Sequence, residues 1–165
     1  MSNLCFTGHR DFLKNKDNEY REMFKQKMLG LLLEYIKEKD VDTFYAGGAS
    51  GFDNFAADCV LELKKEFPNI QLIEVLPFDR NNMIKKWDAQ EQKLLLRICK
   101  YADEIIEDRG SDYYKDCYKK RNQYMVNHAD YCIAWYDDKS KKRSGTGQTV
   151  RMAEKKGIQI MNLFD

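Results

Sequence analysis

The stretch GGASGFD, residues 47–53, stands between an apolar run, VDTFYA at residues 41–46, and a periodic pattern that begins at Phe52. The run is rich in branched and aromatic residues, which favours a strand. The pattern places apolar side chains at helical spacing, at Phe52, Phe55, Ala56, Cys59, Val60 and Leu63. Two interpretations of the glycine turn fit this position. Its backbone N–H groups could hold a phosphate at the helix N-terminus, or glycine could simply supply the positive φ of a tight turn.

The same alternation of strand and helix extends in both directions from the turn. Strands are predicted at residues 4–6, 41–46, 70–76, 103–107, 131–136 and 158–163, and helices at residues 17–39, from 52 up to Pro68, 88–100, 112–127 and 148–156. This order predicts one Rossmann-like α/β domain over residues 1–165, with a mainly parallel sheet of six strands between two layers of helices. Right-handed crossovers then bring four loops to the carboxyl edge of the sheet, where ligands bind: residues 7–10, 47–53, 77–80 and 137–148.

Composition narrows the class of protein. The 165 residues are 43% hydrophobic, which is enough for a core, and 28 Lys and Arg nearly balance 27 Asp and Glu. The net charge of +1 gives no global argument for nucleic acid or an anionic membrane. There is no signal-peptide pattern and no apolar run long enough to span a bilayer, so we expect a cytoplasmic protein. The five cysteines form no C-x-x-C, which predicts buried small hydrophobes and no metal site.

The motif Thr7-Gly8-His9-Arg10 ends the first strand, which is central in doubly wound sheets. His9 is one of only two histidines and falls in a loop. Arg10 carries a planar fork of donors that suits phosphate or carboxylate, although it could also pair with a nearby acid. At this switch point of the sheet, we interpret the motif as part of a ligand site.

Asp53 lies in the first turn of the helix that follows the glycine turn. A carboxylate there could cap the helix or complement its dipole, and it could equally accept hydrogen bonds from a ribose.

A second glycine turn, Ser144-Gly145-Thr146-Gly147-Gln148-Thr149, also precedes a helix and can present donors to an anion. The basic run KSKKR at residues 139–143 is interpreted as a solvated loop that could steer an anion inward.

Aromatic and polar residues near the same edge have simpler explanations. Trp87, Phe78 and Tyr136 could stack on a base, but aromatic side chains at a sheet edge more often belong to the core. Arg121 and Asn122 could reach the crevice, but we place them on the surface face of their helix.

Five motifs together resemble the YpsA-like branch of the SLOG superfamily, which also contains the LOG proteins and the DNA-processing protein DprA. They are TGHR, GGASGFD, LPFD, RNQYMVNHADYCIAWYD and SGTGQTVRMAEKKG, in that order along nearly the whole chain. The resemblance implies a Rossmann-like sheet whose glycine turns bind nucleotides or nucleotide-derived ligands. The candidate ligand-binding residues are Thr7, Gly8, His9, Arg10, Gly47, Gly48, Ala49, Ser50, Gly51, Asp53, Pro77, Phe78, Ser144, Gly145, Thr146, Gly147 and Gln148.

Catalysis is a separate question. LOG-type phosphoribohydrolases, which this chain resembles, contain a Pro-Gly-Gly-x-Gly-Thr-x-Glu-Glu pattern in which a glutamate acts on an N-glycosidic bond. Here Gln148 and Thr149 replace the acids, and an amide cannot act as a general base. We therefore expect a binding protein, without a required cofactor, that senses or sequesters a small nucleotide derivative, with ADP-ribose or an NAD-derived molecule as the leading candidate. The alternatives are a nucleotide hydrolase using Asp53 or His9 and, disfavoured by the charge balance, a DprA-like partner of single-stranded DNA. A homodimer is expected only on the general ground that homodimers are common among proteins of similar fold.

Overall fold

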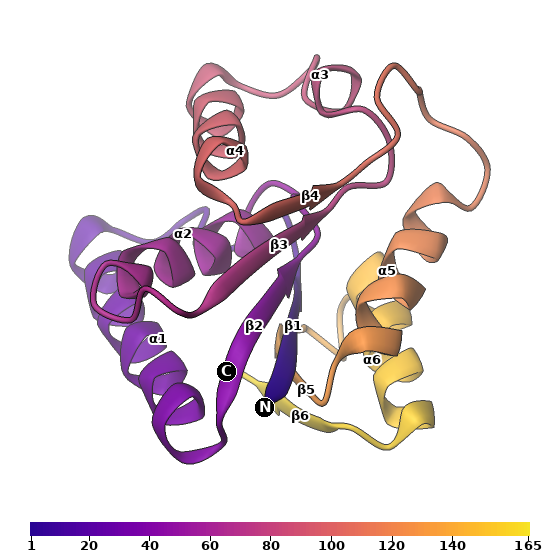
Figure 1. The fold of residues 1–165 in the computed structure, drawn as a ribbon. Helices are drawn as coiled ribbons and strands as arrows, with labels where there is room; N and C mark the ends of the chain where they lie inside the picture. The colour runs from indigo at the N-terminus through magenta and orange to yellow at the C-terminus, as the bar shows by residue number, and fades with distance from the viewer.

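The computed structural model describes all residues from Met1 to Asp165. Six strands and six helices alternate along the chain in Figure 1. In order, they are β1 (Ser2–Gly8), α1 (Asn18–Glu38), β2 (Val41–Ala46), α2 (Phe52–Lys64), β3 (Gln71–Val75), α3 (Arg80–Met83), α4 (Ala89–Tyr101), β4 (Glu104–Ile106), α5 (Cys117–His128), β5 (Tyr131–Trp135), α6 (Gly145–Lys156) and β6 (Gln159–Asn162).

The strands form one sheet in the order β4-β3-β2-β1-β5-β6, and every neighbouring pair is parallel. The predicted six-stranded parallel sheet is therefore confirmed. Strand β1 lies between β2 and β5, so the connections run to opposite sides of the sheet from this point. In doubly wound folds the ligand crevice forms there, outside the carboxyl ends of the strands.

Helices cover both faces of the sheet. Figure 1 shows α1 and α2 on one side and α5 and α6 on the other, with α3 and α4 above the β3–β4 edge. Side chains alternate between these layers along each strand, because successive residues of a strand point to opposite faces. Leu4 and Phe6 join the core cluster beneath α1 and α2, whereas Cys5 between them joins the cluster beneath α5 and α6. All five cysteines are buried and unpaired, as predicted.

The structure differs from the prediction in four places. Helix α2 ends at Lys64, before the predicted end at Pro68. Helix α5 begins at Cys117 rather than Asp112, because Asp116 takes a left-handed conformation with φ 67° that interrupts the helical path. Helix α6 begins three residues earlier than predicted, because the hydroxyl of Ser144 accepts a hydrogen bond from Gly147 N at 3.0 Å and caps it. The short helix α3 was not predicted, and Asp79 caps it in the same way.

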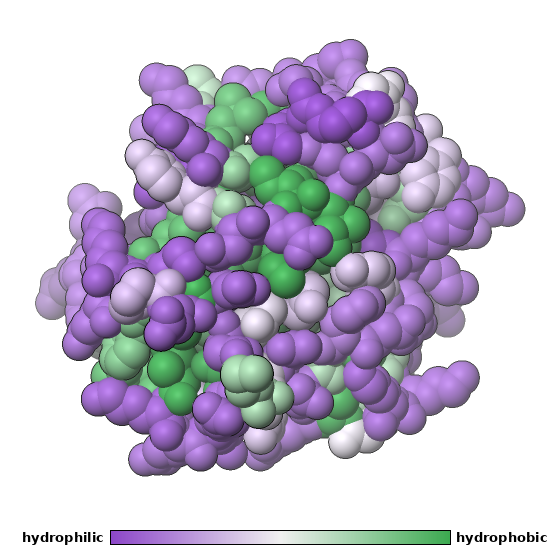
Figure 2. Space-filling model, in the orientation of Figure 1, coloured by the Kyte–Doolittle hydropathy of each residue, from purple (hydrophilic) through white to green (hydrophobic).

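Hydrophilic residues cover most of the face seen in Figure 2, and hydrophobic ones show chiefly where β3 and β4 run beneath α3 and α4. Strand β4 is an edge strand of only three residues. Short edge strands limit pairing with other chains. No helix is both long and apolar enough to cross a membrane.

Candidate functional site

A cavity of about 470 Å³ opens at the carboxyl ends of the central strands. This volume falls in the range of small-molecule sites. Its wall comes from the end of β1 and the loop after it, the glycine turn and first turn of α2, the start of α5 and the start of α6. The lining residues are Thr7, Gly8, His9, Arg10, Ala49, Asp53, Tyr118, Arg121, Asn122, Ser144, Gly145 and Thr146.

The glycine turn packs tightly against the loop that follows β1. A Cβ on Gly51, which has φ 87°, would lie 2.6 Å from the carbonyl oxygen of Arg10. The backbone N–H of Phe52 donates to the carbonyl oxygen of His9 at 3.3 Å. Only a residue without a side chain allows this approach, so Gly51 joins the two loops into one wall of the cavity.

Gly47 makes room for two charged groups that face each other. A Cβ at this position would lie 2.6 Å from Nη1 of Arg121 and 3.0 Å from Oδ2 of Asp53. The carbonyl oxygen of Gly47 also accepts a hydrogen bond from Nη1 of Arg121. Gly47 therefore serves the contact between α2 and α5, and any larger residue would push the arginine and the carboxylate apart.

Arg121 is the most unusual residue in the cavity. It is 8% exposed, and its Nε donates to Oδ1 of Asn122 at 2.8 Å. No carboxylate lies within ion-pair distance of its guanidinium, although pairs of this kind occur elsewhere in the chain. A buried charge without a close partner is costly, so the arrangement favours an anion in the cavity.

Asp53 lies opposite Arg121 and is 5% exposed. Its Oδ1 has no hydrogen-bond partner. Burial raises the pKa of this carboxyl to about 6, while Arg121, Arg10 and the backbone N–H groups of Ala49 and Gly8 pull it down. Asp53 can therefore accept a hydrogen bond when ionised and donate one when protonated, both within the physiological pH range.

His9 is held in one orientation. Its Nε2 accepts a hydrogen bond from the backbone N–H of Asp137 at 3.0 Å, which leaves the ring proton on Nδ1 in the neutral form. Burial, and then the positive charge of Lys141, lower the pKa of the imidazole. His9 is therefore a neutral, oriented side chain that ties the β1 loop to the β5 loop.

The start of α6 offers donors to the cavity. The hydroxyl of Ser144 already caps Gly147 N, and Gln148 N donates to Ser144 O at 3.0 Å. Gly145 and Thr146 hold the first two positions of the helix, whose N–H groups have no acceptor within a helix. Both residues line the cavity, where the helix N-terminus favours negative charge.

The structure brings together nine of the predicted ligand-binding residues in the cavity wall. They are Thr7, Gly8, His9, Arg10, Ala49, Asp53, Ser144, Gly145 and Thr146. Ser50 and Gly51 line a neighbouring hollow that shares Arg10 with the first. Gly47, Gly48, Pro77, Phe78, Gly147 and Gln148 do not line the cavity. Whether each of these residues contacts a ligand stays a prediction.

Two residues assigned to a surface face belong to the cavity wall instead. Arg121 and Asn122 are 8% and 5% exposed, so that assignment was wrong. The reason is that Arg121 and Asn122 lie one turn before the buried Met125 and Val126, on the same face of α5. Tyr118 was also missed. Arg121 and Asn122 interrupt an otherwise apolar face of the helix, and this is a sequence signal for a buried polar site. Spacing alone does not show whether that face points toward the sheet.

The positions that correspond to the LOG acids lie behind the cavity. Thr149 is fully buried, and its hydroxyl donates to the carbonyl oxygen of Gly145 at 3.1 Å. Gln148 is half-buried outside the cavity wall. Among the aromatic candidates, Phe78 and Tyr136 are buried at 5% and 8% exposed, as the core interpretation predicted.

A larger hollow of about 700 Å³ lies over α1, α2 and α4, but most of its charged side chains are in ion pairs. Lys25 pairs with Glu62 at 3.0 Å, and Asp58 pairs with Arg97 at 2.6 Å. This contrast points to the smaller cavity as the functional site.

Known proteins place this chain in a family. A model of the YpsA family, described as the YspA SLOG family, matches residues 4–164. The SPbeta prophage-derived protein YoqJ of Bacillus subtilis is 34% identical over 142 residues, which cover 79% of this chain and 80% of YoqJ. A UPF0398 protein of Staphylococcus epidermidis is 28% identical over 145 residues, which cover 86% of this chain and 76% of that protein.

Two solved structures of DNA processing protein A share the fold. The Helicobacter pylori protein aligns with a TM-score of 0.63 at 19% identity, over 96% of this chain and 63% of that one. The Streptococcus pneumoniae protein aligns with a TM-score of 0.62 at 16% identity, over 97% of this chain and 49% of that one. This chain thus spans between half and two thirds of their length. Because the family model matches from Leu4 to Phe164 and YoqJ aligns over most of both chains, this chain belongs to the YpsA family of SLOG proteins.

Proposed function

We propose that this protein binds a phosphate-bearing, nucleotide-derived ligand in the cavity at the carboxyl edge of the sheet. The observation that carries the proposal is Arg121, a buried guanidinium that lines the cavity without a carboxylate in ion-pair contact. Nε and Nη1 of Arg121 donate within the protein, whereas Nη2 has no partner there and can donate to a phosphate, which also supplies the missing charge.

Other groups of the cavity would each contact a different part of the ligand. Arg10 is exposed and lines the cavity, as do the first residues of α6, whose N–H groups could also hold phosphate oxygens. Asp53 lines the same cavity, and its carboxylate suits a ribose hydroxyl. We take ADP-ribose or an NAD-derived molecule as the leading candidate, held for sensing or sequestration.

Calorimetric titration with ADP-ribose, NAD, ADP and ribose 5-phosphate tests the proposal. Arg121→Met removes the charge and keeps much of the side-chain volume, and we expect at least a tenfold loss of affinity, since hydrogen bonds to charged groups contribute about 1.5–3 kcal/mol. Arg97→Met, on the exposed side of α4, is the matched control and should bind as the wild type does. If no phosphate compound binds, or if both variants bind equally well, the proposal is wrong.

A second candidate is cleavage of the bound ligand. Asp53 has a pKa raised to about 6 inside a cavity, which is the property that general acid–base catalysis requires. Chromatography of the same mixtures would detect released base or phosphate. Product that disappears in Asp53→Asn would establish the protein as a hydrolase, and intact ligand after long incubation would exclude it.

A third candidate is single-stranded DNA. The solved Helicobacter pylori protein is described by its single-stranded DNA binding mode. In the present chain, Tyr113 and Tyr114 are exposed, Tyr113 beside Tyr118 of the cavity wall, and Lys115, Lys119 and Lys120 are exposed nearby in sequence. Tight binding of an oligonucleotide with a steep salt dependence would support this function over a mononucleotide site.

A further inference from the structure

We infer that the loop between β4 and α5, together with the first turn of α5, forms a binding site for the aromatic base of the ligand, with Tyr113 and Tyr118 as the stacking surface. This inference rests on the proposed function, because it assigns the part of the ligand that the phosphate and ribose contacts leave free.

Tyr118 connects the cavity to this loop. It lines the cavity, and its ring centroid lies 5.7 Å from Cζ of Arg121 and 6.0 Å from Cζ of Arg10. An anion held by these two arginines would therefore lie alongside the Tyr118 ring. The ligand then continues past Tyr118 toward solvent.

Tyr113 stands next along that path. Its ring centroid lies 6.1 Å from that of Tyr118 and 6.3 Å from that of Phe78, which supports both rings from below as a buried side chain. Tyr113 is nevertheless 63% exposed, and the adjacent Tyr114 is 43% exposed. These are two of only seven large hydrophobic side chains exposed on the protein, and the Tyr113 ring is in contact with Tyr118 of the cavity wall. Exposed aromatic rings beside an anion site are the arrangement that holds a base by stacking.

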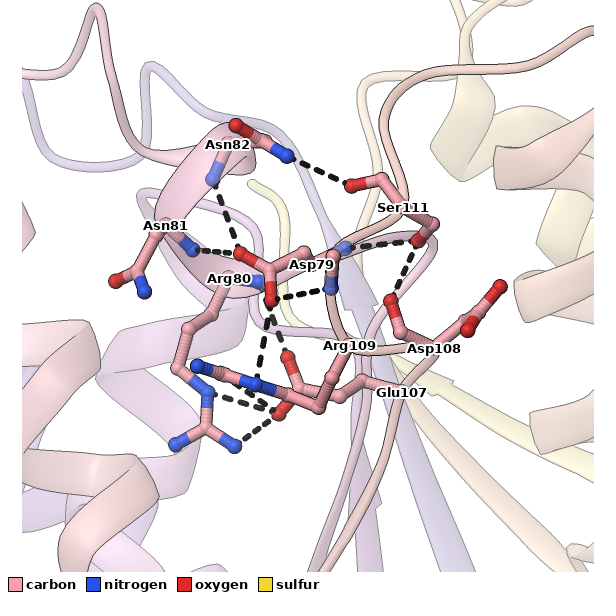
Figure 3. A network of polar contacts seen from close by, with 9 residues as sticks. Asp79, Arg80, Asn81, Asn82, Glu107, Asp108, Arg109 and Ser111 are labelled. Carbon is pink, nitrogen blue, oxygen red and sulfur yellow. Dashed lines mark hydrogen bonds and ion pairs between the residues drawn. The ribbon is translucent and has the colours of Figure 1, made fainter.

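A charged network keeps this loop in place. Figure 3 shows Asp79 at its centre, where the carboxylate accepts from Asn81 N at 2.9 Å and from Gly110 N at 3.1 Å and pairs with Arg109 at 3.3 Å. Asp79 belongs to the loop after β3, and Gly110 and Arg109 belong to the loop after β4. One carboxylate therefore joins the two loops.

Glu107 and Ser111 strengthen the same junction. The nearly buried carboxylate of Glu107 accepts from the backbone and the guanidinium of Arg80, and Asn82 Nδ2 donates to Ser111 O at 2.8 Å. None of these charged groups lines the cavity. Their effect is to hold rigid the loop that arches from β4 to α5 in Figure 1, so that the tyrosines need little ordering when a base binds.

The chemistry selects an aromatic base, which a free nucleotide and a single strand both carry. Three probes separate these sources: ribose 5-phosphate, which has no base, ADP, and a thymidine oligomer of about ten nucleotides. Fluorescence anisotropy and calorimetry would give the affinity of each probe for the full chain.

We expect Tyr113→Ala to bind base-containing probes about tenfold more weakly and ribose 5-phosphate as well as the wild type does. Tyr113→Phe should restore binding, because stacking needs the ring and not the hydroxyl. Tyr101→Ala changes a tyrosine of similar exposure on α4, 56% against 63%, and as the control it should leave the affinities unchanged. Because Tyr113 is exposed, these substitutions leave the fold intact.

The outcomes distinguish the two proposals. Tyrosine-dependent binding of ADP assigns a free nucleotide, and tyrosine-dependent binding of the oligomer alone assigns a strand. If ADP and the oligomer bind but Tyr113→Ala leaves both affinities unchanged, the base site is wrong and the phosphate site stands. If Arg121→Met also changes nothing for any probe, the phosphate site itself is wrong.

Discussion

Glu74 offers a direct test of the buried polar groups beneath the glycine turn. It lies in β3 between Ala46 of β2 and Ile105 of β4, is fully buried, and neither of its carboxyl oxygens has a hydrogen-bond partner. Burial, followed by the nearby negative charge of Asp53, raises the pKa of Glu74 from 4.5 to about 8, and Arg121 opposes the shift. The carboxyl is therefore protonated in the folded protein at neutral pH.

The sign of the resulting pH dependence follows from linkage. Between pH 4.5 and about 8 the unfolded chain has released the proton of Glu74 while the folded chain still holds it. Raising the pH therefore favours unfolding, by about 1.4 kcal/mol per pH unit for this one group. The stability that protonated Glu74 contributes to the folded state is fully present below pH 4.5 and is lost by about pH 8.

Glu74→Gln removes the ionisation and keeps the size of the side chain. We expect the free energy of unfolding of the variant to exceed that of the wild type by about 1 kcal/mol at about pH 5.5 and by about 3 kcal/mol at about pH 7. The difference grows because the folded wild type keeps a proton that its unfolded chain releases more readily as the pH rises. Urea unfolding at several pH values measures this difference. Glu66→Gln, an exposed glutamate in no ion pair, is the control and should run parallel to the wild type.

A constant difference between Glu74→Gln and the wild type across this pH range would refute the reasoning. It would mean that Glu74 has its ordinary pKa in the folded protein, and that its carboxylate has a hydrogen-bond partner there.

Three further predictions concern single groups. Gly47→Ala should lower the free energy of unfolding by about 1–3 kcal/mol and weaken ligand binding, because its Cβ would strike Arg121, and both changes are measurable by thermal unfolding and titration. Gly30→Ala should instead stabilise the protein by about 0.5–1 kcal/mol, because the helix interior has open space there; any destabilisation would contradict the packing described. His9 should stay neutral with its proton on Nδ1 through the physiological range, because burial lowers its pKa and Asp137 N binds Nε2; ¹⁵N chemical shifts of an imidazolium at neutral pH would show otherwise.

The sequence by itself determined the architecture of this protein. Alternating strand and helix patterns allow only a parallel sheet with helices on both faces, and residues 41–46 form β2 as predicted. Most other boundaries lie within two residues of the predicted ones, because apolar periodicity and caps such as Asp88 act locally. The same topology places the loops that follow β1, β2 and β5 at one edge, so the location of the cavity was also predictable.

Only the tertiary structure decided which side chains make up the cavity wall. Arg121 and Asn122 enter it because they lie one turn before the buried Met125 and Val126, on the helix face that packs against the sheet, and only the packing shows that this face also borders the cavity. The glycine turn shows the same division. Its sequence allowed a phosphate cradle or a tight turn, whereas packing places Gly47 against both Arg121 and Asp53 and Gly51 against the backbone of Arg10. The physical reason is that helical and strand patterns depend on near neighbours, while these contacts join residues far apart in the chain.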